Sequence, residues 1–136
     1  MKLNNTTKRS NKGMTLLELT VVILVLLSLI SILFIGARAW KKGSDRAGCI
    51  LNIRNVQQAV RGDQNMKGKV PGATGLVVAD IFGSDGYLNA APTCPSAGTA
   101  YNGIASTTYP AIGTTYITCA DANYSAEHVP ANSDQW

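Results

Sequence analysis

The sequence predicts an α+β protein in which N-terminal helical structure carries a small antiparallel sheet. Three patterns predict this class. Residues 19–37 form an uninterrupted run of nineteen uncharged, mostly aliphatic residues. Residues 47–60 place apolar side chains at spacings of three and four, which is one face of an α-helix. Residues 99–104 and, more strongly, 114–119 contain β-branched and aromatic residues, which predicts two short strands laid on the helix.

The apolar run is long enough to cross a membrane. In a helix its residues would span about 29 Å, close to the thickness of the hydrocarbon core of a bilayer. The run is long for the apolar region of a secretory signal peptide, and no small-residue cleavage site follows it. Four Lys or Arg residues precede it and four follow closely, so positive charge does not fix its orientation. Arg38, Lys41 and Lys42 are interpreted as a membrane-flanking anchor.

The net charge of +4 comes from the start of the chain. Four of the twelve basic residues lie in the first thirteen positions, and the other eight are balanced by eight acidic residues. The rest of the chain has no dense basic cluster interleaved with aromatic residues, so we expect no nucleic-acid partner. The single histidine, His128, lies in a polar tail without a catalytic motif. We therefore expect a solvated His128 and a protein that is not an enzyme.

Glu18 lies inside the apolar sequence of residues 14–23. An ionisable residue at membrane depth is unfavourable unless it is paired, which indicates a functional role. A Glu18 solvated at headgroup level is the alternative, and the residue pattern alone leaves both open.

The surrounding residues 12–19, KGMTLLEL, resemble the processing site of type IV prepilins and type II secretion pseudopilins. In that family a short basic leader ends in Gly, the next residue becomes the methylated N-terminus, and a Glu stands fifth in the mature chain. The resemblance implies cleavage after Gly13, methylation of Met14 and an assembly role for Glu18. Met14 replaces the commoner Phe. The Pro often found late in the apolar run is absent, and Gly36 stands in that neighbourhood.

The resemblance also implies a domain organisation. Residues 1–13 would be the leader, 14–40 the transmembrane and filament-core helix, 41–65 its amphipathic continuation, and 66–136 a small globular extracytoplasmic domain. The residues alone also permit a helix break at Gly43, with Ser44 as the next N-cap. The long N-terminal helix of the family favours a continuous helix.

The function implied by the resemblance is that of a filament subunit. The chain would cross the bacterial inner membrane once and assemble into a pseudopilus or type IV pilus, in the periplasm or at the cell surface. Its expected partners are copies of itself, other pilins or pseudopilins, the prepilin peptidase, the inner-membrane assembly platform and, before assembly, lipid. Two alternatives stay open: a minor pilin at the filament tip that initiates assembly or binds DNA or substrate, and a plain membrane-anchored binding domain.

The chain has three cysteines, and this odd count leaves at least one thiol unpaired in a monomer. Without a C-x-x-C pair, neither a zinc ribbon nor a thioredoxin-like site is predicted. Residues 94–129 resemble the C-terminal part of some prepilin-type proteins, which favours a Cys94–Cys119 disulfide. Closing that loop of about 25 residues would contribute about 3.5 kcal/mol in the chain-entropy model. Three buried free thiols are the alternative, and Cys49 is expected to pack as a small apolar residue.

No cofactor is expected. Some major pseudopilins bind calcium in a C-terminal loop, which makes a Ca²⁺ site conceivable at Asp121, Glu127 and Asp134. Their spacing matches no calcium motif, so solvated loop charges are the preferred interpretation.

Overall fold

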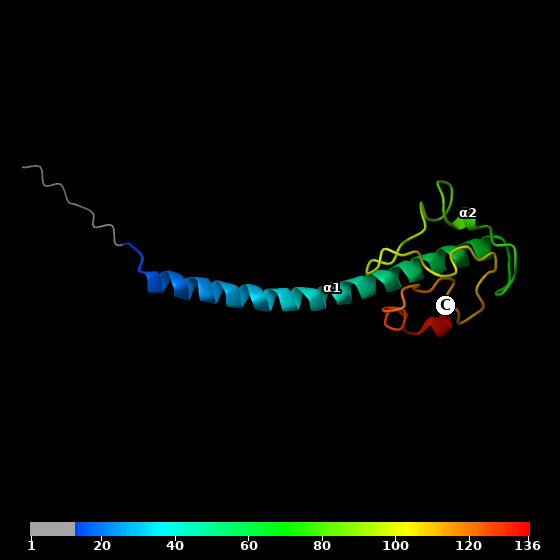
Figure 1. Cartoon of the computed structure of the whole chain (residues 1–136). Coiled ribbons are helices and arrows are strands. Elements are labelled where there is room, and N and C mark those ends of the chain that lie inside the picture. Colours follow the sequence, from blue (N-terminus) through cyan, green and yellow to red (C-terminus); the bar gives the residue numbers. More distant parts are fainter. Residues whose placement is uncertain (1–12) are drawn as a thin grey trace, which may run out of the picture. The chain divides into compact units, whose positions relative to one another are not determined.

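The computed structural model describes residues 13–136, and residues 1–12 of the predicted leader lie outside this part. Helix α1 runs from Leu16 to Met66, α2 from Val78 to Ile81, and the short 3₁₀ helix η1 from Ser133 to Gln135 (Figure 1). The chain divides into two compact units between Arg38 and Ala39.

The first unit contains a capped, apolar helical segment. The Thr15 hydroxyl oxygen accepts a hydrogen bond from the Glu18 backbone N–H at 3.3 Å. Oε2 of Glu18 in turn accepts from the Thr15 backbone N–H at 2.8 Å and from the Thr15 hydroxyl at 3.0 Å. These reciprocal bonds form a capping box that starts α1. The side chains that follow, up to Arg38, are exposed, and the helix is long and apolar enough to cross a membrane.

Hydroxyl groups in this segment bond to their own helix. Three of them donate to backbone carbonyl oxygens three or four residues earlier: Thr20 to Leu17, Ser28 to Val25 and Ser31 to Leu27. Such bonds satisfy a hydroxyl without water, which suits a helix surrounded by lipid or by other apolar helices.

The second unit is organised around the rest of α1. The prediction of one continuous helix is confirmed, because α1 passes through Gly43 without a break. Its buried face includes Cys49, Ile53, Val56 and Val60, and these residues belong to a core shared with the loops of residues 67–136. Figure 1 shows those loops and α2 lying along this part of the helix. Helix α2 lies within the apolar stretch of residues 75–83.

The predicted α+β class is wrong. Residues 13–136 contain isolated bridges but no β-strand, so the expected antiparallel sheet is absent there. The two predicted strands do meet, at one antiparallel bridge between Asn102 and Thr118. The backbone N–H of Asn102 donates to the Thr118 carbonyl at 2.9 Å, and that of Thr118 donates to the Asn102 carbonyl at 3.1 Å.

Side chains of α1 explain why the pairing does not extend into a sheet. The amide nitrogen of the buried Gln57 donates to the Thr114 carbonyl at 3.1 Å, and its amide oxygen accepts from the Tyr116 N–H at 2.8 Å. Gln57 thus bonds two backbone groups that a neighbouring strand would otherwise pair. Arg61 holds two further segments to α1. Its guanidinium donates to the Pro110 and Ala111 carbonyls at 2.9 and 3.0 Å and to the Trp136 backbone oxygen at 2.9 Å.

Gly103 permits the close approach at the bridge, and its substitution gives a first prediction. Its φ is +87°, and a Cβ added there would lie 2.5 Å from the Tyr116 carbonyl oxygen. Gly103→Ala therefore adds a backbone clash to the strain of a left-handed residue. We expect it to lower the free energy of unfolding by about 2 kcal/mol more than Gly72→Ala does. Thermal unfolding of the two full-length variants in detergent measures the difference.

Gly72 is a matched control for that substitution. Its φ is +82°, and an added Cβ would meet nothing within 4 Å. The two substitutions therefore share the conformational strain and differ in the clash. Equal destabilisation would contradict the close approach of Gly103 to Tyr116.

Candidate metal centre

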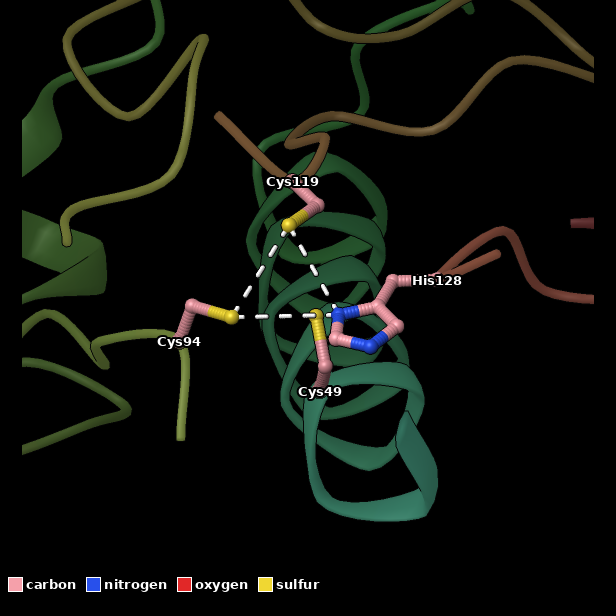
Figure 2. A group of neighbouring side chains, drawn as sticks. All are labelled: Cys49, Cys94, Cys119 and His128. Carbon is pink, nitrogen blue, oxygen red and sulfur yellow. Dashed lines mark hydrogen bonds between the residues drawn. The ribbon is translucent and has the colours of Figure 1, made fainter. Parts of the chain in front are cut away.

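Four side chains from separate parts of the chain converge in the core of the second unit. Their ligand atoms all lie within 4.8 Å of one another, and all four residues are buried. Figure 2 shows them pointing toward a common centre from α1 and three loops. We name this group the Cys3His cluster: Cys49, Cys94, Cys119 and His128.

The distances among Cys94, Cys119 and His128 are short and similar. Sγ of Cys94 and Sγ of Cys119 are 3.8 Å apart. Nδ1 of His128 lies 3.8 Å from the first sulfur and 3.7 Å from the second. Cys49 contributes the third sulfur from the buried face of α1.

A tight turn positions Cys94. Its carbonyl accepts the Gly98 N–H at 2.7 Å, and Gly98 has a φ of +66°, which a glycine adopts without strain. Burial opposes ionisation of the thiol, but the backbone N–H groups of Ser96 and Ala97 inside the turn favour the thiolate. Together with the neighbouring thiols they lower the pKa of Cys94.

The other two thiols are held less favourably as thiolates. Burial raises the pKa of Cys49 to about 12, although the Tyr101 hydroxyl acts in the opposite direction. Burial also raises the pKa of Cys119, against the opposing effect of the Asp121 backbone N–H. Each of the three cysteines therefore has a neighbouring donor group that favours its thiolate. Without a bound cation, burial keeps the thiols of Cys49 and Cys119 protonated.

His128 is not in a solvated tail, so that prediction is wrong. Only 1 % of it is exposed. Its ring stacks on Tyr124 with the centroids 5.3 Å apart and an interplanar angle of 14°, and its backbone N–H donates to the Tyr124 carbonyl at 2.8 Å. The turn that makes this bond brings Nδ1 to the sulfurs. Nε2 is buried and has no hydrogen-bond partner in the part of the chain that the structure describes.

The predicted disulfide stays a prediction. All three cysteines are free thiols, and the 3.8 Å between the sulfurs of Cys94 and Cys119 far exceeds a disulfide bond of about 2.05 Å. The pairing expected from the sequence nevertheless concerns two residues that the fold does bring together. The expectation that Cys49 packs in the core agrees with its complete burial.

The conceivable calcium site gains no support. In the described range 13–136, the Cys3His cluster is the group of candidate metal ligands, and the three loop carboxylates form no such group. Glu127 pairs instead with Lys42 at 3.1 Å, and Asp121 accepts the Asn123 backbone N–H at 2.8 Å. The ligands that do converge are sulfur and nitrogen, which suit zinc rather than calcium.

The predicted processing and assembly residues lie at the start of α1, in the first unit. Gly13 and Met14 precede the helix and are exposed, and Glu18 is in its first turn. The structure gives Glu18 a local role, in the capping box with Thr15.

The Cys3His cluster was not predicted from the sequence, because its ligands do not form the closely spaced pairs that mark a zinc motif. The four residues are far apart in sequence, and only Cys119 and His128 are within ten positions of each other. A signal was present in the combination of an odd cysteine count, a single histidine and the turn-forming run CPSAG at residues 94–98.

No protein-family model matches the chain, and no curated protein and no solved structure is significantly similar to it. The function therefore has to be inferred from the residues and their arrangement.

Proposed function

We propose that this chain is a structural subunit of a type IV pilin-like filament, either a pseudopilus that supports type II protein secretion or a type IV pilus. The observation that carries the proposal is the order of features at the start of the described chain. An exposed Gly13–Met14 peptide precedes the helix, Glu18 follows in the first helical turn, and an exposed apolar segment continues to residue 37. A plain anchor would need the apolar segment alone.

Cleavage after Gly13 would give Glu18 a partner. It would create an α-amino group on Met14, and Glu18 lies four residues further along the chain, about 6 Å up a helix axis. When subunits stack with an axial offset, the carboxylate of one can meet the amine of the next. Two charges that are each unfavourable in an apolar filament core then neutralise each other. A wrong offset leaves a buried charge unpaired, so the pair selects the register.

Before assembly the apolar segment would hold the subunit in the bacterial inner membrane. It satisfies its hydroxyl groups internally and carries no charge between Glu18 and Arg38, as a lipid-exposed helix requires. The second unit would be extracytoplasmic. The proposal implies contact with prepilin peptidase, the inner-membrane assembly platform and other pilins or pseudopilins.

The mature N-terminus tests the proposal. We expect the full chain, produced in a bacterium that has a prepilin peptidase, to begin at a methylated Met14. N-terminal sequencing and the intact mass of the membrane-extracted protein measure this. Gly13→Val should block processing, and so should deletion of the peptidase.

Gly43→Ala is the matched control, because Gly43 is exposed within α1 and an added Cβ meets nothing within 4 Å. This variant should be processed normally. A wild-type protein that keeps its first thirteen residues in the presence of the peptidase would exclude the filament proposal and leave a plain anchored domain.

A further inference from the structure

We propose that the Cys3His cluster binds one Zn²⁺ ion, as a structural centre that fastens three loops of the second unit to α1. This inference goes beyond the filament proposal and does not depend on it, because all four ligands belong to residues 39–136.

The geometry of the cluster fits tetrahedral zinc. With Zn–S bonds of about 2.3 Å and a Zn–N bond of about 2.05 Å, a regular tetrahedron has S–S edges of roughly 3.8 Å and S–N edges of roughly 3.6 Å. The corresponding distances here are 3.8 Å between the sulfurs of Cys94 and Cys119, and 3.8 and 3.7 Å from these sulfurs to Nδ1 of His128. Cys49 would supply the fourth vertex: its sulfur lies within 4.8 Å of the other ligand atoms, so it would move inward by up to about 1 Å to complete the tetrahedron.

The ligand set selects the metal and the type of site. Three thiolates and one imidazole favour Zn²⁺ over Mg²⁺ or Ca²⁺, which prefer oxygen. Four protein ligands complete a tetrahedron, and all four are buried, so no position is left for water or substrate. Such a closed site is structural. Binding would release the three thiol protons to solvent, with no change in oxidation state.

The surroundings of the sulfurs suit a bound cation. Zinc with three thiolates carries a net charge of −1, which must be stabilised in the core. The backbone N–H groups of Ser96 and Ala97 favour a thiolate at Cys94, and that of Asp121 favours one at Cys119. The Tyr101 hydroxyl donates to the Cys49 carbonyl at 3.5 Å and also favours the thiolate of that residue. Asn52 donates to the Tyr101 hydroxyl oxygen at 3.2 Å and so helps to orient that donor.

A metal also explains why His128 is buried. Among residues 13–136, its Nδ1 contacts only sulfur, a weak hydrogen-bond partner, and its Nε2 has no hydrogen-bond partner. Burying an imidazole without strong hydrogen-bond partners is unfavourable. A coordinate bond to Nδ1 would compensate for the burial of that nitrogen and would place the ring proton on Nε2. A Cys94–Cys119 disulfide, by contrast, would leave no reason for the third thiol and the imidazole to converge on the same point.

Zinc would cross-link the loops of the second unit to α1. Residues 39–136 contain no sheet, and their three cysteines are not linked by disulfides. Small domains with limited cores commonly depend on a metal or disulfides for stability. Because the unfolded chain does not hold the ligands together, much of the binding free energy becomes folding free energy.

The test uses the full chain extracted in detergent without a reducing agent. We expect one Zn²⁺ per chain by elemental analysis and native mass spectrometry, and protection of all three thiols from alkylation until a chelator is added. Replacement by Co²⁺ should give the intense ligand-field bands of tetrahedral cobalt together with a thiolate-to-cobalt charge-transfer band.

Variants distinguish a specific zinc site from a disulfide and from adventitious binding of zinc. Cys49→Ala should lower Zn²⁺ affinity by more than the roughly 100-fold that loss of an outer-shell partner costs. His128→Cys should keep one Zn²⁺ in a four-thiolate site and shift the cobalt spectrum, which provides a folded variant if Cys49→Ala does not fold. Val60→Ala, a truncation on the same buried face of α1, should keep full stoichiometry.

Two results would overturn the proposal. One is a metal-free wild-type chain whose mass is lower by two hydrogen atoms, which would show a disulfide. The other is zinc retained at the same affinity in a folded Cys49→Ala variant, which would show adventitious binding.

Discussion

Glu18→Gln is expected to leave membrane insertion and processing intact and to abolish filament assembly. Gln retains the capping-box hydrogen bonds with Thr15 but cannot carry the charge that would neutralise the α-amino group of a neighbouring subunit. Removing one partner of a buried ion pair typically costs about 3–5 kcal/mol, which at each contact between subunits lowers association by more than 100-fold. The measurement is the amount of sheared or sedimented filament, checked by electron microscopy, relative to total subunit in the membrane.

Thr15→Val separates the two roles that Glu18 can have. It removes the hydroxyl that accepts the Glu18 backbone N–H and donates to Oε2, but it leaves the carboxylate in place. Loss of such a cap costs about 1 kcal/mol of helix stability. Filaments should therefore still form. Two outcomes would show that Glu18 is a helix cap and not an assembly residue. In one, Thr15→Val and Glu18→Gln form filaments equally well. In the other, Thr15→Val forms no filaments while Glu18→Gln does.

The helix could be predicted from the sequence because its signals are local. Two local patterns predict helix: the uncharged run of residues 19–37 and the apolar spacing of residues 47–60. Helix α1 extends over both. The buried face differs in detail from the predicted one. Ala47 is exposed and Ile50 only partly buried, and Cys49 is the first fully buried residue of α1. Which side of an amphipathic helix is covered depends on the loops that pack there, and no local pattern encodes their positions.

The sheet was predicted wrongly because β-propensity reports that a segment is extended and half-buried, not what pairs with it. Residues 114–119 have suitable side chains, and Tyr116 and Ile117 are buried. Their backbone groups bond to a helix side chain, Gln57, to one bridge residue, Asn102, and, at Thr114, to the nearby Ala111 carbonyl at 3.2 Å. A glutamine on a predicted helix is ordinarily assigned to the solvated face, so the sequence carries no clear sign of this arrangement.

The candidate metal ligands could not be grouped from the sequence for a related reason. Zinc motifs are recognised when two ligands share one turn, and here each ligand comes from a different segment. Their convergence depends on three loops folding back on α1. Only the turn at Cys94 has a recognisable sequence pattern: a proline and a glycine shape a loop whose backbone N–H groups favour the thiolate of Cys94.

Gln57→Leu is expected to destabilise the second unit by about 4 kcal/mol. Only 3 % of Gln57 is exposed. Leucine has a similar volume but leaves the Thr114 carbonyl and the Tyr116 N–H buried without partners, at roughly 1–3 kcal/mol each. In a domain of this size the melting temperature should fall by about 15–30 °C. Near-ultraviolet circular dichroism of the full chain in detergent, at fixed free Zn²⁺ concentration, measures the shift.

Gln58→Leu is the matched control, because the neighbouring Gln58 is exposed and the same substitution there leaves no buried group unpaired. Its effect should stay within about 0.5 kcal/mol. Gln57→Glu divides the effect further, since its carboxylate can still accept the Tyr116 N–H but can no longer donate to the Thr114 carbonyl. We expect its stability to lie below that of the wild type. If Gln57→Leu melted together with Gln58→Leu, residues 114–116 would have to find backbone partners elsewhere. A strand pairing in solution would then be the first alternative to examine, and Gln57 would no longer account for the missing sheet.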